Sequence, residues 1–285
     1  MNQRRISGSA RLCLLLVLFA AGSLALAAEP LRIAGLPFEN REATVRAYTP
    51  LVNYLQRLMR RPVELVYLDS YQAIMDALDN GQLEVGMLGP LPYSLLSRRN
   101  PMIEPLVVFR ERSGEGRFRC ALVRFAGDKL DPNKLRGKRI ALPDRLAACS
   151  YLGANAIVQE RSGHGLEETR YQFFNNHQEA ALAVIGGQAD AAVIKDEFAT
   201  ANAALGLEVI ATSDWIPSSG LFVNRARLDA QLIKELRRIL LAIPPEEYQR
   251  WAHVLKYGMA EATARDFDVM QRFGDPSRTP LTGKP

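Results

Sequence analysis

The chain has 285 residues, of which 48% are hydrophobic and 24% are charged. This composition is typical of a globular protein and excludes a disordered or fibrous chain. The formal net charge is +5, but residues 1–27 hold three arginines and no acid. Without these three, 33 basic residues face 31 acidic ones, a net charge of only +2. So balanced a chain lacks the positive surface expected of a dedicated nucleic-acid binder.

The first 27 residues are typical of a secretory signal peptide. Arg4 and Arg5 precede an apolar run over residues 12–21, and Ala25-Leu26-Ala27 supplies the small-residue cleavage pattern. An uncleaved membrane anchor is the alternative, because residues 12–28 approach the shortest length that spans a bilayer. We expect cleavage after Ala27, and therefore a periplasmic protein that meets a membrane only through a partner.

The first half of the mature chain alternates between strand and helix patterns. Pro50 lies inside the first helix, where it predicts a kink or the first turn, and Asp69 or Ser70 is expected to cap the second helix. The expected strands cover residues 31–36, 63–68 and 83–88, and the expected helices cover 44–61, about 71–80 and about 93–98. Three successive strand–helix units predict an α/β fold with a mostly parallel sheet.

The same alternation then begins again. Strands are expected at residues 103–109, 118–124, 139–142, 169–174, 189–194, 207–211 and 221–223, and helices at 147–161, 176–187, 197–205, 228–243 and about 248–255. With no linker between the two sets, we expect two lobes: 28–110, then 111–205, with 206–285 returning to the first lobe. A ligand is expected in the cleft between them, beyond the carboxyl ends of the strands.

Three segments resemble a known family. They are E-V-G-M-L-G-P-L-P-Y (residues 84–93), L-R-G-K-R-I-A-L-P-D (135–144) and F-N-N-H-Q-E-A-A-L-A-V-I-G-G-Q-A-D-A-A (174–192). In this order they resemble the PhnD-like phosphate, phosphite and phosphonate substrate-binding proteins of ABC transporters, over about residues 31–225. The resemblance implies a type II periplasmic binding-protein fold, two lobes closing on a small anion, and delivery to a membrane permease. It implies neither an enzyme nor a cofactor nor a metal site.

The resemblance also implies ligand contacts. Tyr93 matches an aromatic residue that packs against the ligand, although a core tyrosine is the alternative. His177 matches a histidine at the start of a helix and is expected to donate to an oxyanion, the alternative being a helix cap. Glu197, beside Asp196, follows a strand where the family has a polar or acidic residue, and an acid there also complements the helix dipole.

One stretch departs from the family pattern. Relatives carry Ser-Thr-Ser-Gly before a Tyr-Leu pair, whereas this chain has Ala147, Ala148, Cys149 and Ser150 before Tyr151. We expect residues 148–151 to bind an anion through backbone N–H groups, with each lost hydroxyl contact costing about 1 kcal/mol. Ser219 stands where an aspartate for a ligand amine is expected, which argues against an aminophosphonate. Phe38 indicates an apolar wall.

Alternatives remain open at this point. A periplasmic sensor that signals to a histidine kinase or a cyclase would need the same lobes and cleft. An enzyme is a weaker alternative, since the common hydrolase, metalloprotease, phosphate-loop and dinucleotide motifs are missing from the sequence. Its nucleophile would be Cys149, at a helix start. Pairing of Cys120 with Cys149 is left undecided, because their spacing predicts neither a disulfide nor a metal site.

Overall fold

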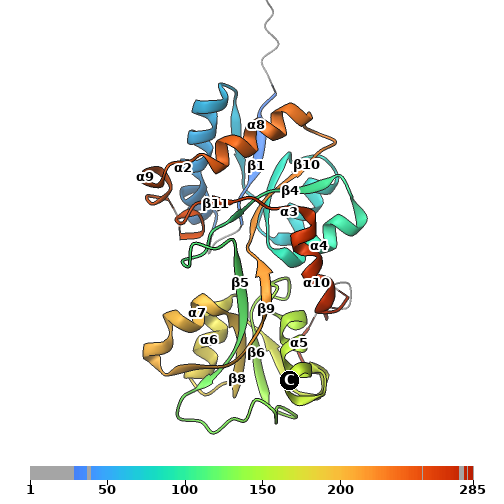
Figure 1. Cartoon of the computed structure of the whole chain (residues 1–285), viewed down its shortest axis with the longest axis vertical. Coiled ribbons are helices and arrows are strands. Elements are labelled where there is room, and N and C mark those ends of the chain that lie inside the picture. Colours follow the sequence, from blue (N-terminus) through green and yellow to red (C-terminus); the bar gives the residue numbers. More distant parts are fainter. Residues whose placement is uncertain (1–28, 37–39, 252, 276–278, 281, 285) are drawn as a thin grey trace, which may run out of the picture.

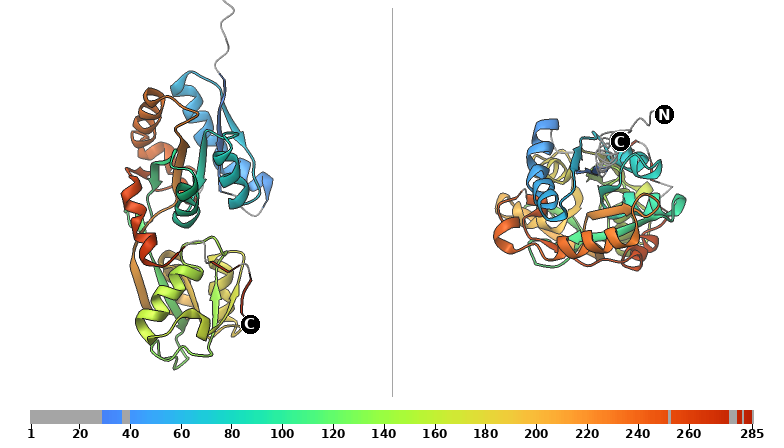
Figure 2. Two further views of the ribbon diagram at one scale, coloured as in Figure 1. Left: turned by 90° about the vertical axis from the view of Figure 1, so that its right-hand side faces the viewer. Right: turned by 90° about the horizontal axis from the view of Figure 1, so that it is seen from above.

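The chain folds into two α/β lobes that lie one above the other (Figure 1). This computed structural model describes residues 29–36, 40–251, 253–275, 279–280 and 282–284. The expected signal peptide and Phe38 lie outside the described residues. Two long strands, β5 (Arg117–Phe125) and β9 (Leu207–Pro217), rise from the lower lobe toward the upper one, and Figure 2 shows the same division from two further directions. The predicted α/β two-lobed architecture is therefore confirmed.

Lobe 1, the upper lobe, is built on a six-stranded sheet in the order β11-β4-β10-β3-β1-β2. Its strands are β1 (Leu31–Ala34), β2 (Val63–Val66), β3 (Val85–Leu88), β4 (Ile103–Phe109), β10 (Gly220–Asn224) and β11 (Met259–Ala260). Strands β1, β2 and β3 are parallel, as the sequence predicts. β10 is antiparallel to its neighbours β3 and β4, so β4 runs in the same direction as β1, β2 and β3.

Helices cover both faces of this sheet. α2 (Arg41–Met59) and α8 (Ala230–Leu241) pack on one face, and α3 (Tyr71–Asp79) and α4 (Pro90–Arg99) on the other. Ser70 caps α3 by accepting a hydrogen bond from the N–H of Ala73 (3.2 Å). Pro50 lies inside α2, which continues through it to Met59. The short segments α9 (Pro245–Tyr248) and η3 (His253–Leu255) follow α8.

Lobe 2 has a five-stranded sheet in the order β7-β6-β8-β5-β9. Its other strands are β6 (Arg139–Leu142), β7 (Arg170–Phe173) and β8 (Ala191–Lys195). α5 (Tyr151–Ser162) packs on one face, and α6 (His177–Ile185) and α7 (Asp196–Ala201) on the other, with 3-10 turns η1 (Leu166–Glu168) and η2 (Ala203–Leu205) nearby. None of the described helices has both the length and the apolar character needed to cross a membrane.

The path of the chain differs from the expected domain boundaries in two places. β9 pairs with β5 along its whole length, so lobe 2 continues to Pro217 instead of ending at residue 205. After β11 the chain crosses back: η4 (Ala264–Asp268) and α10 (Val269–Arg272) run along the junction, and Lys284 forms a bridge with Tyr171 of β7. The last segment therefore adds to lobe 2, because β7 has an unpaired outer edge that accepts it.

In both lobes the carboxyl ends of the parallel strands face the junction between the lobes. β8 is antiparallel to β5, with Lys195 opposite Cys120 near the start of β5, so the carboxyl ends of β6, β7 and β8 point toward lobe 1. In lobe 1, Leu88 at the end of β3 lies opposite Gly220, where the chain enters from lobe 2. The helices that follow all these strands thus begin at the junction between the lobes.

Two short crossovers join the lobes, at residues 110–116 and 218–219. Directly after the second crossover, Gly220 lets β10 lie close to β4, because a Cβ atom at this position would lie only 2.1 Å from the carbonyl oxygen of Val107. A side chain at this position would push β10 away from β4, so glycine is needed for the close approach.

Candidate ligand-binding site

A disulfide holds the turn that leads into α5. Cys149 is bonded to Cys120 on β5, with 5.1 Å between their Cα atoms, which settles the pairing that the sequence leaves open. The side chains of Ala148, Cys149 and Ser150 are all buried, and the Ser150 hydroxyl donates to the Pro143 carbonyl (3.1 Å). The backbone N–H of Ser150 donates to the Ala147 carbonyl (3.0 Å). Ala148 and Cys149 therefore have only their backbone to offer a ligand, and Cys149 has no free thiol to act as a nucleophile.

The first turn of α5 offers hydrogen-bond donors. The backbone N–H groups of Tyr151 and Leu152 donate to no residue within the described parts of the chain. α5 has 12 residues, and its amino end, with unpaired N–H groups and a partial positive charge, favours an anion. The Tyr151 hydroxyl turns to Glu167 (2.8 Å), and burial and this carboxylate raise its pKa to about 12.

His177 begins α6 as a neutral side chain with a defined proton position. The backbone N–H of Lys195 donates to its Nδ1 atom (3.1 Å), and its ring stacks on Phe198 at 5.1 Å between centroids. Burial, and then the charge of Lys195, lower the pKa of His177 to about 3. Since Nδ1 accepts, the proton of the neutral ring is on Nε2, which can donate to an oxyanion.

A cavity of about 200 Å³ lies between the lobes beside His177. It draws residues from both crossovers, from the start of α7 and from lobe 1: Phe109, Arg110, Glu111, Lys195, Glu197, Phe198, Ser219, Val254 and Tyr257. Two expected site residues, Glu197 and Ser219, thus line one cavity, and His177 lies next to it because its ring stacks on Phe198.

An ion-pair cluster forms one wall of this cavity. The Lys195 ammonium lies 2.6 Å from Glu111 Oε2 and 2.8 Å from Glu197 Oε1, and the Ser218 hydroxyl donates to the other oxygen of Glu111. Burial alone would lower the pKa of Lys195, but the two carboxylates outweigh it and raise the pKa. For Glu111 burial is the larger effect: it outweighs the charge of Lys195 and raises the pKa of Glu111.

Tyr93 lies elsewhere, in the core of lobe 1. Its side chain is 3% exposed, stacks on Phe222 (4.5 Å between centroids) and meets Phe267 edge to face (4.6 Å). It lines a separate cavity of about 350 Å³, together with Ser97 and Glu104. The structure therefore brings His177, Glu197 and Ser219 together and places Tyr93 apart from them.

Comparisons with known proteins identify the family. The family model of the ABC transporter phosphonate periplasmic substrate-binding proteins matches residues 33–267. The chain belongs to this family. The phosphate-import protein PhnD of Mycolicibacterium smegmatis is 24% identical over an alignment of 173 residues that covers 57% of this chain and 54% of that protein. The match thus spans about half the length of this curated relative.

Two solved structures share the fold. PhnD1 from Prochlorococcus marinus in complex with methylphosphonate superposes with a TM-score of 0.72 at 14% identity, covering 86% of this chain and 97% of that one. XAC2383 from Xanthomonas citri, bound to chloride, gives a TM-score of 0.69 at 15% identity, covering 85% and 95%. The type II periplasmic binding-protein fold expected from the sequence is confirmed.

The phosphonate-binding family resemblance does not reveal every residue of the cavity. Lys195 directly follows a predicted strand, so the sequence predicts its position at the junction between the lobes. Only the acidic residues after it, Asp196 and Glu197, suggested a binding site there. Glu111 lies in a crossover without a pattern, and only the folded chain brings it to Lys195. The place of Arg110 in the cavity is likewise known only from the folded chain. Its guanidinium donates to the backbone carbonyls of Met259 (3.1 Å) and Gly114 (2.6 Å).

The neutral state of His177 predicts a pH-dependent stability. Between pH 6.5 and pH 3 the unfolded chain protonates this histidine and the folded protein does not. Stability is therefore lost as pH falls below 6.5, and we expect His177 to account for about 2 kcal/mol between pH 7 and pH 5. Urea unfolding at both pH values checks this: His177→Gln should lose less stability on acidification than the native protein. His164→Gln is the matched control, and an equal pH dependence in the native protein and His177→Gln would contradict the assignment.

Proposed function

We propose that this protein is the periplasmic component of an ABC transporter that captures a small phosphonate- or phosphate-like anion between its lobes. A membrane permease would then receive the ligand from the closed form. Lobe closure would give the permease a state to recognise, since contacts made only in the closed form couple binding to that state.

One observation carries this proposal: hydrogen-bond donors without negative charge follow adjacent strands of lobe 2, at the edge that faces lobe 1. The N–H groups of Tyr151 and Leu152 follow β6, and His177 with its Nε2 proton follows β7, the neighbouring strand. Adjacent parallel strands bring the helices that follow them to one edge. Such an arrangement favours an oxyanion through helix dipoles and hydrogen bonds, with no metal needed.

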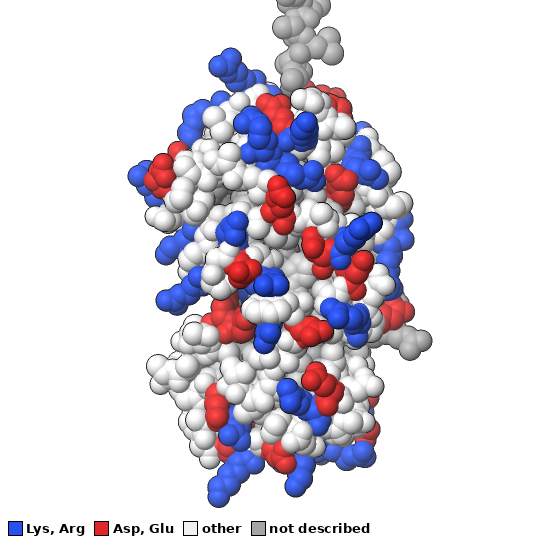
Figure 3. Space-filling view, in the orientation of Figure 1, with Lys and Arg blue, Asp and Glu red and all other residues white. Residues whose placement is uncertain are grey.

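Further features agree with an exported carrier. The disulfide between Cys120 and Cys149 suits an oxidising compartment such as the periplasm. On the face shown in Figure 3, basic and acidic side chains are interspersed over both lobes, which does not favour a polyanionic partner. Transport is favoured over sensing because the matched family is defined by its role in ABC transporters.

Calorimetric titration with methylphosphonate, inorganic phosphate and acetate tests the proposal. We expect the first two to bind and acetate to bind much more weakly, because acetate presents two oxygens to the donors, whereas methylphosphonate presents three and phosphate four. A ligand at 100 times its dissociation constant should stabilise the protein by about 2.7 kcal/mol. His177→Gln should weaken methylphosphonate binding roughly 10- to 100-fold, the worth of one hydrogen bond to a charged group.

His164→Gln serves as the control, because His164 lies in the loop before η1, where its Nδ1 lies 3.2 Å from the Gly165 carbonyl oxygen. The methylphosphonate affinity of His164→Gln should equal that of the native protein. If none of the three anions produces heat or a thermal shift, the protein does not bind small oxyanions of this kind, and the proposal is wrong.

A further inference from the structure

The cavity between the lobes contains its own cation. Four charged side chains line it, Arg110, Lys195, Glu111 and Glu197, and their formal charges cancel. The Arg110 guanidinium is engaged by two backbone carbonyls, whereas the Lys195 ammonium lies between the two carboxylates, 2.6 Å from one and 2.8 Å from the other. Each carboxylate facing the cavity is therefore already paired within the protein.

This pairing is well sheltered from solvent. The side chains of Lys195, Glu111 and Glu197 are 18%, 13% and 21% exposed. The ammonium also lies 5.1 Å from the centre of the Phe118 ring, which adds a cation–π contact. A second ammonium entering the cavity would lose its hydration and find no unpaired carboxylate among the described lining residues.

The remaining lining suits an uncharged group. Phe109, Phe198 and Val254 supply apolar surface, and Ser219 supplies a neutral hydroxyl. His177 stacks on Phe198, so this cavity adjoins the donors proposed to hold the anion. A ligand with its anionic head at those donors would place its tail toward the cavity.

On the basis of the proposed function, we infer that Lys195 is a specificity-determining residue. Its ammonium occupies the position between Glu111 and Glu197 that an amine on the ligand tail would need. The protein therefore selects anions with short uncharged tails, such as alkylphosphonates, over aminoalkylphosphonates. Lys195 makes this selection by neutralising the acids and needs no direct contact with the ligand.

Calorimetry with ethylphosphonate and 2-aminoethylphosphonate tests the inference, because the two probes differ only in the amine. The native protein should prefer ethylphosphonate by about tenfold. Lys195→Met frees both carboxylates and should shift the affinity ratio toward the amine roughly 10- to 100-fold. Lys234→Met, a change on the exposed face of α8, should keep the native ratio.

A second variant keeps the test decisive if Lys195→Met fails to fold. Glu197→Gln leaves Lys195 paired with Glu111 and makes the lining positive, so its ratio should move further against the amine. A purely structural role of Lys195 would instead weaken both probes equally. If the native protein binds ethylphosphonate but neither variant changes the ratio, or if it binds methylphosphonate or phosphate but neither probe, the inference alone is wrong. If it binds neither probe and also neither methylphosphonate nor phosphate, the proposed function fails and the inference with it.

Discussion

Tyr93→Ala is expected to lower the free energy of unfolding by about 3 to 5 kcal/mol, the usual cost of removing a buried aromatic ring. The ring fills the space between Phe222 on β10 and Phe267 in η4, with centroid distances of 4.5 and 4.6 Å. Its loss would leave a cavity in lobe 1 and would also loosen the segment that crosses back toward lobe 2. Urea unfolding followed by circular dichroism measures the change.

Tyr93→Phe separates packing from ligand contact. It keeps the ring, so its stability should stay close to that of the native protein. The sequence predicts a ligand contact for Tyr93, whereas its place in the core of lobe 1 leads us to expect unchanged methylphosphonate affinity in Tyr93→Phe. A stable Tyr93→Ala variant would show that the aromatic cluster does not support the lobe, and a tenfold loss of affinity in Tyr93→Phe would return the hydroxyl to the binding site.

Removing the disulfide is expected to cost a similar amount. The bond joins residues 29 positions apart, and opening a loop of this size costs about 3 to 4 kcal/mol in the chain-entropy treatment. Removing the bond also releases the turn before α5 from β5. Gly153 leaves space for the Cys120 sulfur there, since a Cβ atom added to Gly153 would lie only 3.1 Å from that sulfur. Urea unfolding of Cys120→Ala/Cys149→Ala beside the oxidised native protein measures the effect.

The native protein treated with a reductant is the control, because it loses the bond without losing the side chains. It should resemble the double variant in its unfolding midpoint. Equal stability of the oxidised protein and both comparison samples would contradict the role given to the bond.

Strand and helix periodicity predicted the fold well because most elements have one apolar face. The alternation through residue 194, the Ser70 cap and the two lobes all appear in the structure. The start of α5 was expected at Ala147 and lies at Tyr151, because Leu146, Ala148 and Cys149 are buried in a turn and are apolar for that reason. The length of β9 was missed because Thr212, Ser213 and Asp214 interrupt its apolar pattern. Ser213 is nevertheless buried, and its hydroxyl accepts a hydrogen bond from the N–H of Cys120 (3.0 Å).

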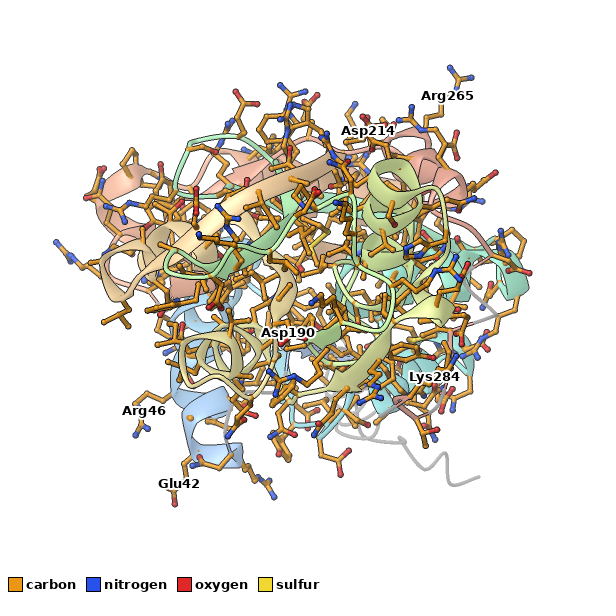
Figure 4. All side chains as sticks on the ribbon, turned by 90° about the horizontal axis from the view of Figure 1, so that it is seen from below. Glu42, Arg46, Asp190, Asp214, Arg265 and Lys284 are labelled. Atoms are coloured by element: carbon orange, nitrogen blue, oxygen red, sulfur yellow. A yellow bond between two sulfur atoms is a disulfide. The ribbon has the colours of Figure 1, made fainter. Side chains whose placement is uncertain are left out.

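The site was less accessible from the sequence because it depends on pairings between distant segments. His177 and Glu197 each follow a predicted strand, so their place at the junction was readable. The ion pair between Glu111 and Lys195 could not be predicted, because Glu111 lies in a crossover and Lys195 lies at the end of β8. A second ion pair between distant segments was equally hidden in the sequence. Arg139 and Asp190 pair at 2.6 Å at the amino ends of β6 and β8. Figure 4 shows Asp190 on the lower end of the molecule, away from the junction between the lobes.

We propose that the first turn of α5 and His177 together hold the anion. Backbone amide resonances, followed by nuclear magnetic resonance during titration with methylphosphonate, test it most directly. We predict that the amides of Tyr151 and Leu152 show the largest changes, together with the side-chain Nε2 proton of His177. Saturable changes confined to other parts of the protein, with these three signals unmoved, would contradict the account.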